Sequence, residues 1–152
     1  MDNKKKINAL NELVEINNDR IKGYDKASEN TEERDLKDLF LEFKQTSQKC
    51  IGELNNEISQ FGGTATDETN ASGKFFRAWM DFKTALTGKD RKTILDSCEY
   101  GEEQADKMYQ RILNDESEYL SPQQQSMINE QHIRLKSDRN KIKTLQNNLV
   151  VA

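Results

Sequence analysis

Apolar residues recur at steps of three and four along most of this 152-residue chain, the spacing that puts side chains on one face of an α-helix. The stripe runs through Ile7, Leu10, Val14, Ile21 and Tyr24 over about residues 4–29, and through Leu36, Phe40, Phe43, Cys50, Leu54 and Phe61 over about residues 32–61. No stretch of useful length alternates apolar and polar residues as a half-buried strand does. The pattern predicts an all-α chain of long helices, each burying one stripe.

Three further helices follow from the same spacing. A short aromatic helix is predicted over about residues 71–87, a fourth helix over about 90–115 and a fifth over about 122–149. Local residues mark the starts and stops. These are N-caps at Thr31 and Asp90, a Gly62-Gly63 stop after the second helix, and a capping box from Ser121 to Gln124 with Pro122 at the first helical position.

The lengths of the connections predict how the helices are arranged. The first two helices are joined by a short turn, so they should run antiparallel. The polar stretch 64–70 is the one long connection, long enough to cross most of a bundle. We therefore expect one domain over residues 1–152, with a four-helix bundle in residues 1–115. An additional helix over 122–149 is expected to pack on the outside of that bundle or on a partner chain.

Polar residues interrupt the predicted buried seams near the midpoint of each of the first four helices. They are Asn17, Ser47, Trp79 and Glu102. Midpoints of antiparallel helices meet, so these groups are expected to form one polar layer. A buried carboxylate is costly unless it is paired, hydrogen-bonded or protonated, and Asn17, Ser47 and the Trp79 indole are the expected donors to Glu102. The layer is interpreted first as a device that fixes helix register. A metal or small-molecule site, and a Glu102 that faces solvent, are the alternatives.

Composition narrows the functional classes. The net charge of −4 argues against a dedicated nucleic-acid-binding protein. No apolar run approaches the length needed to span a membrane, and no secretory signal follows the basic N-terminus. We therefore expect a cytoplasmic protein in which Cys50 and Cys98 are buried free thiols, with a disulfide or a redox pair as the alternative. Residues 122–152 carry five Lys or Arg and two Asp or Glu, a net charge of +3 against −7 for the remainder, so the last helix is expected to dock on the acidic body.

Several local motifs then carry a resemblance to a known family. They are Leu10-Asn11-x-Leu13-Val14-Glu15 with Asp19 and Tyr24, the Gly62-Gly63 stop, Arg77-Ala78-Trp79-Met80-Asp81-Phe82-Lys83, Ala85-Leu86-Thr87-Gly88-x-Asp90, and Cys98-Glu99-x-Gly101-Glu102-Glu103-x-Ala105 with Tyr109. With the basic last helix, this set resembles the bacterial ferritin-like four-helix bundles grouped as a domain of unknown function. The resemblance implies a ferritin-like bundle with one long crossover connection and an additional C-terminal helix, and attaches no activity to it.

Two main functional classes remain, and the binding of a small hydrophobic ligand between helices is a third hypothesis. The first is a non-catalytic helical bundle without cofactors, acting through protein association, a homo-oligomer through helical faces included, or in a stress-related structural role. The sequence has no glycine-rich phosphate loop, no Cys-x-x-Cys motif and no histidine in the predicted four-helix core to assist a nucleophile. The second is a degenerate ferritin-like metal protein, an oxidase or a store that binds iron or manganese. Its candidate carboxylate ligands are Glu53, Glu57, Glu99 and Glu102. The single histidine, His132, is expected to be a surface or docking residue rather than a ligand.

Overall fold

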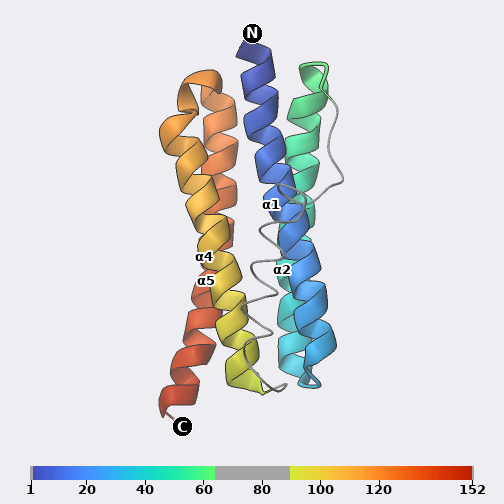
Figure 1. The fold of residues 1–152 in the computed structure, drawn as a ribbon, viewed down its shortest axis with the longest axis vertical. Helices are drawn as coiled ribbons and strands as arrows, with labels where there is room; N and C mark the ends of the chain where they lie inside the picture. The colour runs from blue at the N-terminus through green and yellow to red at the C-terminus, as the bar shows by residue number, and fades with distance from the viewer. Residues whose placement is uncertain (1, 64–89, 152) are drawn as a thin grey trace.

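Four long α-helices make up the part of the chain that the computed structural model describes, residues 2–63 and 90–151 (Figure 1). In chain order the four are α1 (Asp2–Asn30), α2 (Arg34–Gln60), α4 (Arg91–Asp115) and α5 (Pro122–Val151), and the short 3-10 helix η2 (Ser117–Tyr119) lies between α4 and α5. These residues contain no strand, so the predicted all-α class is confirmed for them. The helix expected over 71–87, with Trp79, and the connection 64–70 lie outside the described residues.

The four helices lie side by side as a bundle in which each contacts two neighbours. α1 packs on α2 and α4, and α5 packs on α4 and α2. In Figure 1, α1 and α5 run from the upper to the lower end of the bundle, and α2 and α4 run in the opposite direction. Each neighbouring pair is therefore antiparallel. α2 ends at the end of the bundle where α1 begins, and α4 starts at the opposite end.

The last helix was expected to pack on the bundle of residues 1–115 or on a partner chain, and within the described residues α5 packs on α4 and α2. In the described residues, α5 closes the bundle opposite α1. Its inner side is buried at Ile128, Gln131, Leu135, Asp138 and Ile142. None of these described helices is long and apolar enough to cross a membrane.

Three of the four predicted helix-end signals are confirmed. The Asp90 side chain accepts a 2.7 Å hydrogen bond from the Thr93 amide and caps α4. Ser121 and Gln124 exchange side-chain-to-amide hydrogen bonds of 3.1 and 3.0 Å, the reciprocal pattern of a capping box. Gly62 adopts φ 75°, which L side chains rarely take, and α2 ends two residues before it.

The fourth signal, Thr31, was assigned the wrong role. α2 begins at Arg34 with Glu33 at its N-cap position. The Thr31 hydroxyl instead accepts a 3.1 Å hydrogen bond from the Glu33 amide. Such a bond to the backbone two residues on is a turn motif of Ser and Thr, so Thr31 shapes the turn between α1 and α2 rather than starting the helix.

The inward position of α5 predicts unequal effects for two isoleucines on the same helix. Ile142 is fully buried, whereas Ile133 is 65% exposed. Ile142→Ala should lower the free energy of unfolding by about 2–5 kcal/mol, because it removes buried methyl groups and leaves a cavity. Ile133→Ala should change it by no more than about 0.5 kcal/mol. Urea denaturation followed by circular dichroism measures both, and equal effects would contradict a core position for α5.

Candidate functional site

A fully buried arginine lies at the centre of the bundle. The guanidinium of Arg20 in α1 donates from Nε and Nη2 to both carboxylate oxygens of Glu102 in α4, at 2.8 and 2.7 Å. Nη1 donates to the Ser47 hydroxyl in α2 at 2.5 Å, and Nη2 also reaches Asp138 in α5 at 3.1 Å. Two parallel bonds to one carboxylate are the strongest arrangement that arginine forms, so the Arg20–Glu102 pair is the fixed part of this site.

Tyr24, one turn after Arg20 on α1, completes the site. Its hydroxyl donates to Glu102 Oε2 at 2.5 Å. Its ring packs against Phe40 and Phe43 of α2, with centroid separations of 5.5 and 5.2 Å. The residues of this Arg20 cluster are Arg20, Tyr24, Ser47, Glu102 and Asp138. All four long helices of the described chain contribute to it, so it ties them together at one level.

Burial and neighbouring charges set the protonation states in the cluster. Burial opposes the charge of Arg20, but Glu102 beside it raises its pKa well above the usual value, so the guanidinium stays charged. Burial is the main cause of a raised pKa for Tyr24, and the nearby Glu102 raises it further. The Tyr24 hydroxyl therefore keeps its proton and can donate it in a hydrogen bond. For Asp138, burial is the main cause of a pKa of about 6; Arg20 lowers this pKa and Glu102 raises it. Asp138 therefore titrates near neutrality.

A second polar layer lies beside the first. Asn17 donates to the Tyr109 hydroxyl at 2.8 Å, and Tyr109 donates to Gln131 Oε1 at 2.8 Å. Gln131 Nε2 donates to the backbone oxygen of Cys50 at 3.3 Å and to Glu53 at 3.0 Å. This chain of hydrogen bonds again runs through α1, α4, α5 and α2 in turn. It therefore fixes the register of the same helices about one turn from the Arg20 cluster on α1 and α2, and about two turns from it on α4 and α5.

The residues predicted for the polar layer are divided between these two sets. Asn17, Ser47 and Glu102 are all buried. Ser47 and Glu102 meet in the Arg20 cluster, whereas Asn17 belongs to the second layer; Trp79 lies outside the described residues. Asn17 and Ser47 were expected to donate to Glu102, but Arg20 and Tyr24 occupy that role. The carboxylate is thus compensated by a full positive charge rather than by neutral dipoles.

The spacing of apolar residues did not identify Arg20 or Asp138 as buried residues. The apolar count on α1 selects Ile21, yet Ile21 is only partly buried and Arg20 is fully buried. A step of three from Asn17 reaches Arg20, and a further step of four reaches Tyr24, so the position itself is readable as an inward one. Charged residues are assigned to the solvent by default because they are almost never fully buried without a partner, and the partners come from other helices.

The four candidate metal ligands each have a protein partner. The arginine pairs are Glu53–Arg134 at 3.0 Å, Glu99–Arg139 at 2.9 Å and Glu102–Arg20 at 2.7 Å, and Glu57 accepts from Gln124 at 3.0 Å. Burial raises the pKa of Glu53, but hydrogen bonds from Arg134 and Gln131 outweigh it and lower that pKa. Among the described residues, no three His, Cys, Asp or Glu side chains are grouped so that they could hold a metal ion.

His132 and the two cysteines lie at helix–helix contacts. His132 is 7% exposed; its Nε2 lies 2.5 Å from Asp106 Oδ1 of α4, and its ring stacks on Tyr109 with centroids 5.8 Å apart. It therefore docks α5 on α4, the second of the two roles expected for it. Cys50 and Cys98 are buried free thiols. Burial raises the pKa of Cys50, so a smaller fraction of this thiol is in the reactive thiolate form.

Comparisons with known proteins identify a family for most of this bundle. The family described as "Domain of unknown function (DUF2383)" matches residues 5–115. That range contains four residues of the Arg20 cluster, and Asp138 lies beyond it. A comparison with curated proteins found no match.

The pairing of Arg20 predicts a large loss of stability when its charge is removed. Arg20→Met leaves Glu102 and Asp138 buried without their cation, and should lower the free energy of unfolding by about 3–5 kcal/mol. Arg111 is a matched control, because it pairs with Glu12 and Glu116 at 42% side-chain exposure. Arg111→Met should cost no more than about 1 kcal/mol.

A triple variant separates charge from packing in this experiment. Adding Glu102→Gln and Asp138→Asn to Arg20→Met removes the unpaired carboxylates and should restore part of the lost stability. Urea denaturation of all three variants measures the effects. A cost for Arg20→Met equal to that for Arg111→Met would show that the buried pair does not hold the bundle.

Proposed function

The chain belongs to this family of domains of unknown function, and we propose that it is a non-catalytic helical bundle of ferritin-like topology that works through association with protein chains.

The order of the helices supports the ferritin-like topology. α1 and α2 form one antiparallel pair, and α4 and α5 form the other. α2 ends at the opposite end of the bundle from the start of α4, so these two helices run parallel. A single long crossover between two helical hairpins is a feature of ferritin-like bundles, whereas up-and-down bundles use short loops throughout. On this assignment α5 is the fourth helix of the bundle that the described residues form.

The proposed non-catalytic role is supported by the way in which the buried charges of the bundle are paired within the protein. Di-metal ferritin-like proteins place a Glu on each of two helices and a Glu-x-x-His on each of the other two. Here α1 supplies Arg20 to the centre, and His132, the single histidine of the chain, is engaged with Asp106. Arginine therefore provides the positive charge that a metal ion provides in such a bundle, and the buried donors of the Arg20 cluster are used within the protein.

The outer surface offers the means for association. Leu41 and Ile133 are large apolar residues with 52% and 65% of their surface exposed. The basic segment 122–152 and the acidic remainder give the surface opposite charges on different helices, which favours contacts between copies of the chain. We infer a homo-oligomer through helical faces, or a stress-related structural role that uses the same surfaces.

A carboxylate-bound iron or manganese protein is the second candidate. The observation that favours it is the burial of Glu102 at the middle of the bundle. Glu53, Glu57, Glu99 and Glu102 would be its ligands. To bind a metal there, Glu53, Glu99 and Glu102 would each have to leave an arginine partner, which raises the free-energy cost of the site.

Metal uptake separates the two candidates. We expect protein purified without chelator to contain less than about 0.1 equivalent of iron or manganese per chain by elemental mass spectrometry. A metal that binds the folded state raises stability by about 2.7 kcal/mol at 100 times its Kd, so the melting temperature should not change on adding Fe²⁺ or Mn²⁺ anaerobically.

A four-glutamine variant at positions 53, 57, 99 and 102 is the control for metal bound at other surfaces. Uptake of one or two equivalents by the natural chain, lost in this variant, would establish the metal protein and refute the proposed role.

A further inference from the structure

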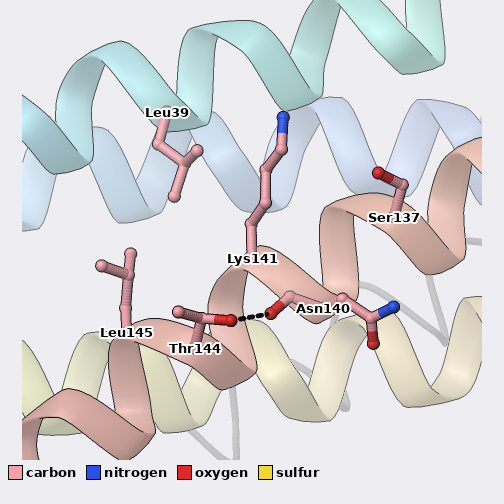
Figure 2. A pocket seen from close by; sticks show the side chains of 6 residues that line it. All are labelled: Leu39, Ser137, Asn140, Lys141, Thr144 and Leu145. Atoms are coloured by element: carbon pink, nitrogen blue, oxygen red, sulfur yellow. Dashed lines mark hydrogen bonds between the residues drawn. The ribbon is translucent and has the colours of Figure 1, made fainter.

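α5 is held unequally by its two neighbours. Along α4, polar contacts extend over most of the shared length, from Tyr109–Gln131 at 2.8 Å to Asp96–Gln146 at 2.9 Å. Along α2, the second half of α5 borders a groove of about 440 Å³ instead. It is lined by Leu39 of α2 and by Ser137, Asn140, Lys141, Thr144 and Leu145 of α5 (Figure 2). The α2–α5 side is therefore the looser side of this helix.

A solvated ion pair bridges that groove. Figure 2 shows Lys141 extending from α5 towards α2, with Leu39 and Leu145 on one side of it. Lys141 Nζ lies 2.5 Å from Glu42 Oε1, and their side chains are 46% and 51% exposed. Pairs exposed to this degree contribute little to stability because water screens them. The groove thus provides a place where α5 can separate from α2 at low cost.

Asp138 lies on the inner side of this same part of α5. It follows Ser137 in the chain and precedes Lys141 by one turn, and its carboxylate is directed to Arg20 rather than to the groove. Glu102 uses both carboxylate oxygens on Arg20, whereas Asp138 has a single 3.1 Å contact with it. When both acids are ionised, two buried negative charges share one guanidinium, and Asp138 is the less firmly held of the two.

The groups around Asp138 come from every helix packed on it. α1 presents the Arg20 cation, and α4 presents the Glu102 carboxylate. α2 presents the Thr46 hydroxyl, which is neutral. On α5 itself, Lys141 lies one turn away and is paired with Glu42 at the surface. A protonated Asp138 leaves one cation facing one anion, and an ionised Asp138 leaves an excess negative charge in the bundle.

We propose that Asp138 is a proton-operated latch, whose protonated carboxyl holds the second half of α5 against α2 and whose ionisation releases that half and widens the groove. The proton lost on ionisation passes to water. Opening hydrates the carboxylate, which relieves the buried excess charge. The inference goes beyond the proposed function and holds whether or not the outer surface binds another chain.

The pKa of Asp138 places this latch near neutrality. Its folded pKa of about 6 lies above the value of 3.8 that an exposed aspartate has. A raised acid pKa means that the closed state binds the proton more tightly than the open state, so closure is favoured at low pH and weakens as the pH rises through about 6. Between about pH 5 and 7.5, the opening equilibrium should increase about tenfold.

Amide hydrogen exchange on the full chain tests this prediction. After correction for intrinsic rates, protection of residues 134–149 should fall about tenfold from about pH 5 to 7.5, while protection in α1 and α4 changes much less. Asp138→Asn cannot ionise and should remove this dependence. Asp38→Asn on α2 is the matched control, because the Asp38 side chain is 73% exposed, and it should behave as the natural chain does.

Two results would overturn the proposal. One is an unchanged pH dependence in Asp138→Asn, and the other is an equal loss of protection in all four helices. If Asp138→Asn does not fold, the natural chain still decides the matter by NMR. The amide signals of residues 137–145 should titrate together with the Asp138 carboxyl carbon at a midpoint near pH 6, and their failure to move in that range would equally overturn it.

Discussion

The structure depends on one buried ion pair, the bidentate contact of Arg20 with Glu102. A guanidinium that is fully removed from water must receive its compensation from within the bundle. Its partners come from α4, α5 and α2, so satisfying Arg20 places three other helices at fixed heights relative to α1. Apolar stripes alone would permit helices to slide by a turn, whereas five donors with set directions permit one register.

This constraint also limits what the interior can do. The donors and acceptors of the Arg20 cluster are directed at one another, and the parallel chain through Asn17, Tyr109 and Gln131 fixes the adjoining level. On the proposed role, the cluster acts as a structural core, and the proton on Asp138 is the part of its chemistry that responds to pH. The proposed function then depends on the outer helical faces of the bundle and on how firmly α5 packs on α2.

The sequence predicts much of this arrangement, and its failures have a common cause. Helix limits, caps and apolar stripes depend on local spacing, so Asp90, Ser121 and Gly62 were placed correctly. Glu102 stood out because an acid interrupts an apolar seam. Arg20 and Asp138 did not stand out, because a buried charge is recognisable only when its partner is known. In the sequence, Arg20 is separated from Glu102 by 82 residues and from Asp138 by 118 residues.

The most direct test of this account is a crystal structure of the natural chain grown with Mn²⁺ or with Fe²⁺ under anaerobic conditions, with anomalous data for the metal. The account predicts continuous density for the Arg20 guanidinium between Glu102 and Asp138, with no anomalous peak inside the bundle. An anomalous peak bound by Glu102, with the Arg20 side chain displaced from it, would contradict the account and identify the interior as a metal site.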